Sequence, residues 1–342
     1  MSRLLDVQNL RTEFTTSEGI VKAVTNVNFH VNKGEIIGIV GESGSGKSVT
    51  MLSVLGLIAD NGRILDGDVT FDGKDLSIYK HKTKNEIKTH EKFMQSIRCK
   101  EISMIFQDPM TFLNPVLRID TQLLEPIKLH LKLSSKEARK KAIELMELVQ
   151  IPSPEKRLKQ YPHEFSGGMR QRIVIAIALS CNPKLMIADE PTTALDVTIQ
   201  AQVLELITEL KKTTDMSVIM ITHDLGVVAS MCSRIVIMYG GRIVEQGTDE
   251  QIFYSPKHPY TMGLLNSINN PESDVREKLK PIKGTPPNLL NPPIGCPFTD
   301  RCDEAMYVCK SLPPPITRSN ETHSWNCWLY HDYARKDDSK HE

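Results

Sequence analysis

Hydrophobic residues alternate with polar ones in the first part of the chain, over residues 5–10 and again over 21–29. A polar Ser-Glu-Gly stretch at 17–19 interrupts the alternation, so the pattern predicts two strands joined by a turn. A continuous apolar run at 36–40 follows, which is typical of a buried strand. A glycine-rich loop and a helical stretch at 49–57 come next. The segment therefore predicts a pair of strands and then a strand–loop–helix unit.

Strands and helices continue to mix further along the chain. Turn residues predict two more hairpins, with Asp-Gly inside residues 67–74 and Gly-Gly inside 235–245. Residues 79–100 are lysine-rich and predict a solvated helix, and a helical pattern with one apolar face covers 120–158. The later pattern predicts a buried strand at 185–188, a helix at 197–213 and another strand at 218–221. We therefore expect an α/β core interrupted by a helical insertion.

The character of the chain changes after about residue 256. Residues 281–293 are rich in proline, which indicates loop or linker structure. The charged tail at 333–342 is expected to be disordered. We therefore expect a core domain at 1–256, a loop-rich extension at 257–332 and a disordered tail.

Composition narrows the class of protein. The chain has 342 residues with 42 basic and 42 acidic side chains, so no net charge attracts it to nucleic acid. Its longest apolar run, at about 173–179, is much shorter than the roughly 18–20 residues that cross a bilayer. Asp6 precedes any long apolar segment, which argues against a secretory signal. With seven cysteines, an odd number, we expect a soluble protein of the reducing cytosol.

The glycine-rich loop at 41–48 is the first candidate functional site along the chain, and its sequence predicts phosphate binding. It reads Gly-Glu-Ser-Gly-Ser-Gly-Lys-Ser and matches G-x-x-x-x-G-K-[ST] between a strand and a helix. Such a loop turns backbone N–H groups toward an anion at a helix N-terminus. Lys47 is expected to neutralise the β- and γ-phosphates of ATP or GTP, and the Ser48 hydroxyl to bind Mg²⁺. The other loop residues expected at the nucleotide are Gly41, Ser43, Gly44, Ser45 and Gly46.

Polar residues also end three apolar segments. Asp189 and Glu190 follow the strand at 185–188; Asp189 is expected to hold Mg²⁺ and Glu190 to activate water for attack on the γ-phosphate. Gln107 and His223 end two other segments, where Gln107 would contact Mg²⁺ or water and His223 would bind the γ-phosphate and orient the water. The alternative interpretation is structural: an acidic pair that caps the next helix, and polar residues that only end strands.

A second anion site is predicted at Ser166-Gly167-Gly168, which opens an apolar helix. Exposed amides, a hydroxyl and the positive end of a helix dipole meet there. A chain with one phosphate loop holds one nucleotide, so the second site is expected to contact a nucleotide held by another protomer. This predicts a head-to-tail dimer that encloses ATP; an ordinary glycine-rich helix start is the alternative.

In order and spacing, these motifs resemble those of the ABC family of ATPases over about residues 4–270. The resemblance implies an α/β P-loop NTPase core with an antiparallel β subdomain and a helical subdomain at about 108–175. Phe165 departs from the leucine common at the start of the signature, but it lies outside Ser-Gly-Gly, so activity is expected to be kept. The matching segments are 41–48 (Walker A), 185–190 (Walker B), Gln107 (Q-loop), 165–169 (signature), 194–196 (D-loop) and His223 (switch histidine).

The same resemblance adds residues to the expected ATP site. It implies that Phe14 stacks on adenine and that Val49 belongs to the site with Walker A. It also implies that Asp196 of the D-loop Ala194-Leu195-Asp196 acts in trans, together with Ser166, Gly167 and Gly168. The expected Mg²⁺ ligands are Ser48, Gln107 and Asp189.

Four cysteines lie in the loop-rich extension with the spacing C-x5-C-x6-C-x17-C: Cys296, Cys302, Cys309 and Cys327. A segment with so little apolar core gains from a metal cross-link, and four thiolates suit Zn²⁺ or a [4Fe–4S] cluster; unliganded thiols are the third interpretation. Residues 256–261, 284–287 and 295–302 resemble the C-terminal extension of oligopeptide and dipeptide importer ATPases. That resemblance implies a structural [4Fe–4S] cluster, with Zn²⁺ as the alternative.

The resemblance implies an ATPase subunit of a bacterial peptide importer at the cytoplasmic face of the cell membrane. Its implied partners are a second, similar ATPase subunit, two transmembrane permease subunits and, through these, an extracellular solute-binding protein. An ATPase of a nickel or other small-solute transporter shares the motifs. A soluble ABC ATPase acting on DNA or ribosomes is disfavoured by the short insertion, the single cassette and the neutral charge, so no nucleic acid partner is expected.

Overall fold

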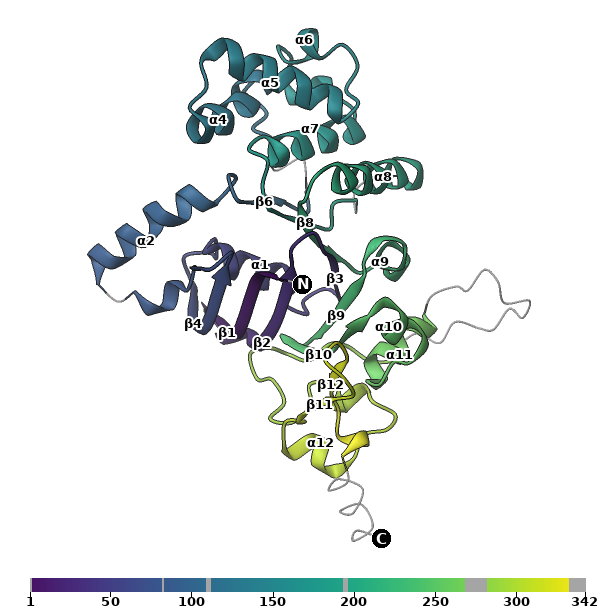
Figure 1. Cartoon of the computed structure of the whole chain (residues 1–342). Helices are drawn as coiled ribbons and strands as arrows, with labels where there is room; N and C mark the ends of the chain where they lie inside the picture. Colours follow the sequence, from purple (N-terminus) through teal and green to yellow (C-terminus); the bar gives the residue numbers. More distant parts are fainter. Residues whose placement is uncertain (1, 82, 109–111, 193–195, 268–281, 332–342) are drawn as a thin grey trace, which may run out of the picture. The chain divides into compact units, whose positions relative to one another are not determined.

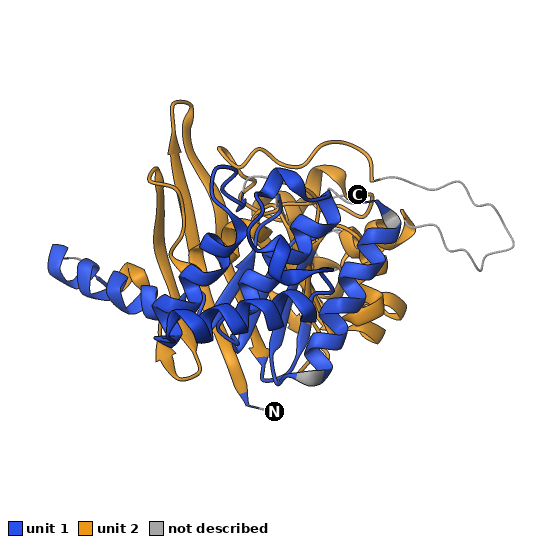
Figure 2. Cartoon of the chain, turned by 90° about the horizontal axis from the view of Figure 1, so that it is seen from above, with its two compact units in different colours: residues 1–2, 32–36, 81–221 blue, residues 3–31, 37–80, 222–342 orange. Residues whose placement is uncertain are grey.

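The computed structural model describes every residue except 1, 82, 109–111, 193–195, 268–281 and 332–342, which form the grey trace in Figure 1. The chain divides into two compact units whose segments interleave along the sequence (Figure 2). Unit 1 contains residues 1–2, 32–36 and 81–221. Unit 2 contains residues 3–31, 37–80 and 222–342. The predicted charged tail at 333–342 lies outside the described residues.

Unit 2 contains a four-stranded sheet in the order β2-β1-β4-β5. β1 and β4 pair antiparallel, and Leu5, Val7 and Leu10 of β1 are buried, which confirms the antiparallel β part of the predicted fold. Asp72 and Gly73 join β4 to β5 with φ angles of 45° and 77°, as a type I′ turn requires. The elements are β1 (Arg3–Thr16), β2 (Gly19–Asn32), β4 (Gly62–Phe71), β5 (Lys74–Asp75) and the 3-10 helix η1 (Ile78–Lys80).

A second sheet of unit 2 includes the strand that leads into the glycine-rich loop. β3 (Ile36–Val40) is buried at every position and pairs in parallel with β9 (Arg234–Tyr239). β9 pairs antiparallel with β10 (Arg242–Thr248) through the predicted double-glycine turn, in which both glycines have positive φ. The helices of this part are α1 (Lys47–Leu55), α9 (Leu225–Met231), α10 (Asp249–Tyr254) and α11 (Pro259–Asn266).

The C-terminal extension adds two strands to the same sheet (yellow in Figure 1). β12 (Ser324–Asn326) pairs antiparallel with β10, and β11 (Ile316–Arg318) pairs with β12. The sequence predicts only a loop-rich segment here, because three-residue strands offer too few alternating positions to be recognised. The extension is therefore continuous with the sheet that carries β3. Its other elements are η3 (Thr299–Arg301), α12 (Tyr307–Ser311) and η4 (Trp328–Tyr330).

Unit 1 contains three neighbouring parallel strands in the order β6-β7-β8. They are β6 (Ile102–Ile105), β7 (Leu185–Asp189) and β8 (Ser217–Thr222), and each is buried along its whole length. The apolar runs at 185–188 and 218–221 are thus confirmed as buried strands. α8 (Val197–Thr213) lies between β7 and β8 in sequence, with the predicted bounds.

The helical pattern predicted at 120–158 is confirmed and forms three helices. α4 (Ile119–Leu131) ends where Lys132 takes a left-handed φ of 54°. A capping box between Ser134 and Glu137 then begins α5 (Ser135–Leu148). The remaining helices of unit 1 are α2 (Lys84–Ile97), α6 (Pro154–Arg157), η2 (Pro162–Glu164) and α7 (Gly167–Leu179).

α2 confirms the solvated helix predicted at 79–100, since only His90, Met94 and Ile97 are buried among its residues. A second capping box, between Thr83 and Glu86, fixes where it begins. Across the described part of the chain, no helix has both the length and the apolar character needed to span a membrane.

Candidate functional site

The phosphate loop lies between β3 and α1 of unit 2. Gly44 and Gly46 have φ angles of 76° and 95°, a region that glycine enters without steric cost. A Cβ at Gly46 would lie 2.6 Å from the carbonyl oxygen of Ala23, so the loop also packs closely on neighbouring backbone. Ser43 and Gly44 are exposed at its tip. The loop therefore has left-handed glycines and an exposed tip, features that suit the binding of an anion.

Lys47 begins α1 directly after this loop, and the side chain of this residue is turned back onto it. Its Nζ donates hydrogen bonds to the carbonyl oxygens of Gly41 (2.7 Å) and Glu42 (3.0 Å), while Lys47 is 5% exposed. The Lys47 ammonium group is thus held beside the loop at a helix N-terminus, a position where phosphate binds favourably. Ser48 and Val49 follow in the first turn of the helix.

The ends of β6 and β7, in unit 1, bring two predicted residues together. The two strands pair in parallel with Ile105 opposite Ala188, so the residues that follow each strand emerge at the same edge of the sheet. Gln107 Nε2 donates a hydrogen bond to Glu190 Oε2 at 3.1 Å. Asp189 is buried, with 4% of its surface exposed. The geometry therefore joins the Q-loop glutamine to the carboxylate expected to activate water.

The backbone of Glu190 is unusual. Its φ is 45°, a left-handed conformation that residues other than glycine rarely adopt and that costs about 1–3 kcal/mol. The Glu190 N–H donates to the carbonyl oxygen of Ile221 at 2.9 Å, which holds the residue in place. Strain of this kind concentrates at functional sites, so the conformation favours a chemical role for Glu190 over a simple helix cap.

The signature segment begins α7, also in unit 1. Ser166 caps the helix by accepting a hydrogen bond from the Met169 N–H at 3.3 Å, and Ser166 and Gly167 are exposed. A Cβ at Gly168 would lie 2.7 Å from Ile199 Cγ2 of α8, so glycine allows the two helices to approach. No acidic side chain occupies the first turn. The start of α7, where the sequence predicts an anion site, is thus exposed and carries no acidic side chain in its first turn.

Phe165, the departure from the usual signature, is accommodated inside unit 1. It is 3% exposed, and the Arg157 guanidinium lies 5.5 Å from its ring centre. The larger side chain thus fills the interior and leaves the Ser-Gly-Gly backbone accessible. Asp196 caps α8 by accepting from the Ile199 N–H at 3.0 Å. Ala194 and Leu195 of the predicted D-loop lie outside the described residues.

Two predicted nucleotide contacts remain in unit 2. His223 is exposed and follows β8, and the next residue, Asp224, caps α9. Phe14 is half-buried on β1 and lies opposite Gly62 of β4. A Cβ at Gly62 would lie 2.7 Å from the ring, so glycine makes the space that Phe14 occupies.

Contacts from the extension to the phosphate loop were not foreseen from the sequence. Arg301 donates hydrogen bonds to both carboxylate oxygens of Glu42, at 2.6 and 3.1 Å. The Glu42 N–H donates to the hydroxyl of Tyr260 at 2.9 Å. No local sequence pattern could reveal this, since 259 positions separate Arg301 from Glu42.

The four extension cysteines converge on one small pocket, together with His258, Phe298 and Trp328. Burial raises the pKa of Cys296 and of Cys327 to about 12, so both thiols are neutral there near pH 7. Across the described residues, no three His, Cys, Asp or Glu side chains are arranged to hold a metal ion. The predicted metal site is therefore not supported by the arrangement of these side chains, although the four thiols share one pocket.

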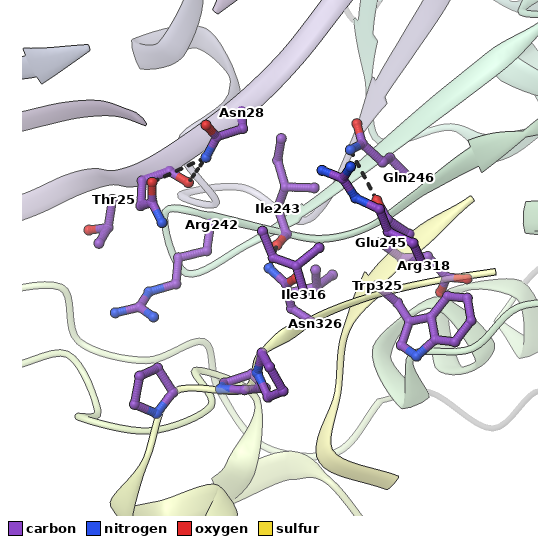
Figure 3. A pocket seen from close by; sticks show the side chains of 16 residues that line it. Thr25, Asn28, Arg242, Ile243, Glu245, Gln246, Ile316, Arg318, Trp325 and Asn326 are labelled. Carbon is purple, nitrogen blue, oxygen red and sulfur yellow. Dashed lines mark hydrogen bonds between the residues drawn. The ribbon is translucent and has the colours of Figure 1, made fainter. Parts of the chain in front are cut away.

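A separate pocket of about 390 Å³ lies among β2, β10 and the extension in unit 2 (Figure 3). Arg242, Trp325 and Asn326 are among the residues that line it. None of the residues predicted to bind ATP is in its lining, so it is distinct from the phosphate loop.

Comparison with known sequence families gives two matches. Residues 24–193 match the family described as ABC transporter. Residues 244–309 match the family described as oligopeptide/dipeptide transporter, C-terminal region. The first match includes the Walker A, Q-loop, signature and Walker B segments, and the second covers most of the described extension.

Characterised relatives match over nearly their whole length. The chain is 53% identical over 337 residues to the oligopeptide transport ATP-binding protein OppD of Bacillus subtilis, covering 98% of this chain and 91% of the relative. It is 53% identical over 331 residues to the dipeptide transport ATP-binding protein DppD of the same organism, covering 96% and 95%. OppD of Salmonella typhimurium is 50% identical over 311 residues, covering 91% and 89%.

Solved structures share the fold of the core. The ATP-binding cassette MJ0796, in a dimeric post-hydrolysis state bound to ADP and Pi, matches with a TM-score of 0.61 and 27% identity, covering 71% of this chain and 98% of that structure. CbiO1 from Clostridium perfringens, part of the ABC transporter complex cbiONQ, matches with a TM-score of 0.59 and 26% identity, covering 75% and 92%.

Proposed function

This chain belongs to the oligopeptide and dipeptide transport ATP-binding proteins of the ABC family, and we propose from that premise that it hydrolyses ATP to power uptake of oligopeptides or dipeptides. The observation that carries the proposal is the 53% identity to peptide transport ATPases across almost the full length of the chain. The left-handed glycines of the phosphate loop and the left-handed backbone of Glu190 support it. The ABC-type ATPase core is shared with ATP-hydrolysing cassettes.

The proposed ATP-binding residues of this chain include a group in unit 2. The amides of Gly41, Ser43, Gly44, Ser45 and Gly46 surround the phosphates, Lys47 neutralises them, and Ser48 binds Mg²⁺. Val49 continues the helix turn beside the nucleotide, and Phe14 stacks on adenine. The left-handed glycines and the turned-back Lys47 side chain support this part of the proposal.

Hydrolysis is assigned to residues at strand ends. Glu190 accepts a proton from the attacking water, Asp189 and Gln107 hold the Mg²⁺ shell, and His223 binds the γ-phosphate and orients the water. The Gln107–Glu190 hydrogen bond supports the pairing. Because Gln107 donates a hydrogen bond to that carboxylate, a shift of the Q-loop would release Glu190 for catalysis.

ATP-driven closure of a head-to-tail dimer would complete the site. Ser166, Gly167 and Gly168 would contact the γ-phosphate bound by the opposite subunit, and Asp196 would act at the same junction. The exposed, uncharged start of α7 supports this, as does the dimeric form in which the MJ0796 cassette was solved. The opposite subunit is proposed to be a second, similar ATPase.

The other proposed partners follow from the transport role. Two transmembrane permease subunits would bind the helical subdomain, proposed at about 108–175, and an extracellular solute-binding protein would deliver peptide to them. The chain would then work at the cytoplasmic face of a bacterial membrane as a peripheral subunit, within the proposed domain boundaries of 1–256 for the ATPase and 257–332 for the extension.

Uptake assays test the substrate class. Cells that lack this subunit should lose accumulation of labelled di- to hexapeptides and keep accumulation of labelled nickel, and the wild-type gene should restore peptide uptake. Unchanged peptide uptake would contradict the proposal, and a selective loss of nickel uptake would assign the chain to nickel import instead. The match of residues 244–309 to the oligopeptide/dipeptide region favours peptide.

We also propose that the four extension cysteines hold a [4Fe–4S] cluster with a structural role. Their convergence on one buried pocket supports this, and a bound cluster would replace the neutral thiols by thiolates. Full-length protein purified without oxygen should be brown and contain about four iron atoms per chain, as the cluster formula requires. A colourless protein with one zinc atom, or with no metal, would contradict it, and Cys302→Ser should lower the iron content.

A further inference from the structure

Glu42, the second residue of the phosphate loop, is held by the C-terminal extension. Its two carboxylate oxygens accept hydrogen bonds from Nη1 and Nη2 of Arg301, at 2.6 and 3.1 Å. The pair is bidentate, the geometry in which an arginine and a carboxylate bind most strongly and with the most defined orientation. The side chain of Glu42 is therefore fixed in position as well as paired in charge.

The guanidinium of Arg301 is itself immobilised on three further sides. Nη1 donates to the Tyr239 hydroxyl at 3.1 Å, Nε to the Lys283 carbonyl oxygen at 2.8 Å and Nη2 to the Ile282 carbonyl oxygen at 3.2 Å. The side chain of Arg301 is only 6% exposed, so water screens these bonds weakly. Only an arginine supplies enough donors in one plane for this arrangement.

The backbone of Glu42 is held from the same direction. Its N–H donates to the Tyr260 hydroxyl at 2.9 Å. The Tyr260 ring lies 4.5 Å from that of Tyr239 and 5.4 Å from that of Phe298 in the extension, centre to centre. Arg301 packs against this group of three rings, and its guanidinium lies 5.6 Å from the ring centre of Tyr239.

These contacts lead directly to the phosphate-binding atoms. The Glu42 carbonyl oxygen accepts hydrogen bonds from Lys47 Nζ (3.0 Å) and from the Ser45 N–H (3.2 Å). Moving Glu42 would therefore move the ammonium that neutralises phosphate and the turn that presents the loop amides. Three hydrogen bonds thus connect the extension to Glu42, and two more connect the Glu42 carbonyl oxygen to Lys47 and Ser45 of the same loop.

We propose that Arg301 is a positioning residue for ATP binding: through Glu42, the C-terminal extension sets the conformation of the phosphate loop and so its affinity for ATP. The proposal rests on the assignment of ATP to this loop. It gives the extension a function inside each ATPase chain, in addition to any role at an interface with other subunits.

A purely structural role for Arg301 makes a different prediction. If the ion pair only anchors the extension, its loss lowers the melting temperature and leaves the affinity of the folded protein for ATP unchanged. If Arg301 positions the loop, the affinity falls in protein that remains folded. An interaction that stabilises the bound substrate and the transition state equally affects only KM. Losing such an interaction therefore raises KM and leaves kcat unchanged.

The test uses the full-length chain and four variants: Arg301→Gln, Arg301→Lys, Glu42→Gln and the Arg301→Gln/Glu42→Gln double variant. Arg318→Gln is the matched control, because Arg318 is an exposed arginine of the extension outside this contact network. The dissociation constant for Mg-ATP, the KM and kcat for ATP hydrolysis, and the melting temperature are measured for each.

Arg301→Gln should weaken Mg-ATP binding and raise KM about tenfold, since a charge-assisted contact of this kind contributes about that factor. Its kcat should stay within about twofold of wild type. Arg301→Lys should recover part of the loss, and the double variant should bind no more weakly than Arg301→Gln, because both changes break one contact. Arg318→Gln should bind like wild type.

Wild-type affinity in folded Arg301→Gln protein would overturn the inference, as would a fall in melting temperature with no change in KM. Additive losses in the double variant would also count against a shared contact. Failure of the proposed function gives a different result: wild-type protein would then not bind Mg-ATP at all.

Discussion

Replacing Glu245 with glutamine should weaken the attachment of the C-terminal extension to the core sheet. The side chain of Glu245, on β10, is fully buried. Its Oε1 accepts hydrogen bonds from the Lys257 N–H and His323 Nε2, and its Oε2 accepts from the His258 N–H, all at 2.8 Å. A buried carboxylate thus joins β10 to two later segments that have little apolar core of their own.

The magnitude follows from this geometry. In either orientation, the NH₂ group that glutamine introduces faces at least one of the three donors, and each buried donor left without an acceptor costs about 1–3 kcal/mol. The remaining bonds also weaken, because they lose the charge of the acceptor. We expect Glu245→Gln to lower the free energy of unfolding of this part by about 2–4 kcal/mol.

The assay is urea unfolding followed by tryptophan fluorescence. The only two tryptophans of the chain, Trp325 and Trp328, are both in the extension, so the signal reports that segment. Glu250→Gln is the control, since Glu250 is exposed on α10 and should change stability by no more than about 0.5 kcal/mol. Equal unfolding midpoints for the two variants would refute the argument that Glu245 connects the extension to the sheet.

Three further results are expected. Glu190→Gln should bind Mg-ATP like wild type but lose at least about a hundredfold in kcat, because a general base contributes about 10²–10⁴; turnover at the wild-type rate would remove Glu190 as the base. Gly46→Ala should weaken ATP binding and lower the melting temperature, because its Cβ would sit at a φ of 95° and 2.6 Å from the Ala23 carbonyl oxygen; an unchanged melting curve would contradict this. Burial raises the pKa of Cys232 to about 12, so iodoacetamide at pH 8 should label this thiol, by mass spectrometry, only after unfolding; labelling of native protein would show that it is accessible as thiolate.

Features encoded in short, contiguous segments could be predicted from the sequence. The phosphate loop needs only eight residues between a strand and a helix, and the left-handed glycines found there follow from the pattern itself. The β9–β10 hairpin and α8 have the predicted bounds within a few residues. The Asp-Gly and Gly-Gly turns could be predicted for the same reason, because glycine readily adopts the backbone angles that each turn requires.

Features that depend on distant contacts could not be predicted. β12 pairs with β10 across 78 positions between Gln246 and Ser324, and its three residues carry no readable alternation. The left-handed backbone of Glu190 is held by a hydrogen bond to Ile221, a residue of another strand. The cysteine spacing indicates a metal ligand set, yet the structure supports only a shared pocket, because spacing along the chain does not fix how thiols are oriented.

The most direct test measures peptide accumulation in cells whose single copy of this subunit carries either Glu190→Gln or Glu147→Gln. Glu147 is an exposed glutamate of α5, so the two cell lines differ only in whether the expected catalytic carboxylate is lost. Uptake of labelled peptides should persist at the wild-type rate with Glu147→Gln and stop with Glu190→Gln, at equal amounts of protein. Equal uptake in the two lines would show that ATP hydrolysis by this chain does not drive peptide import.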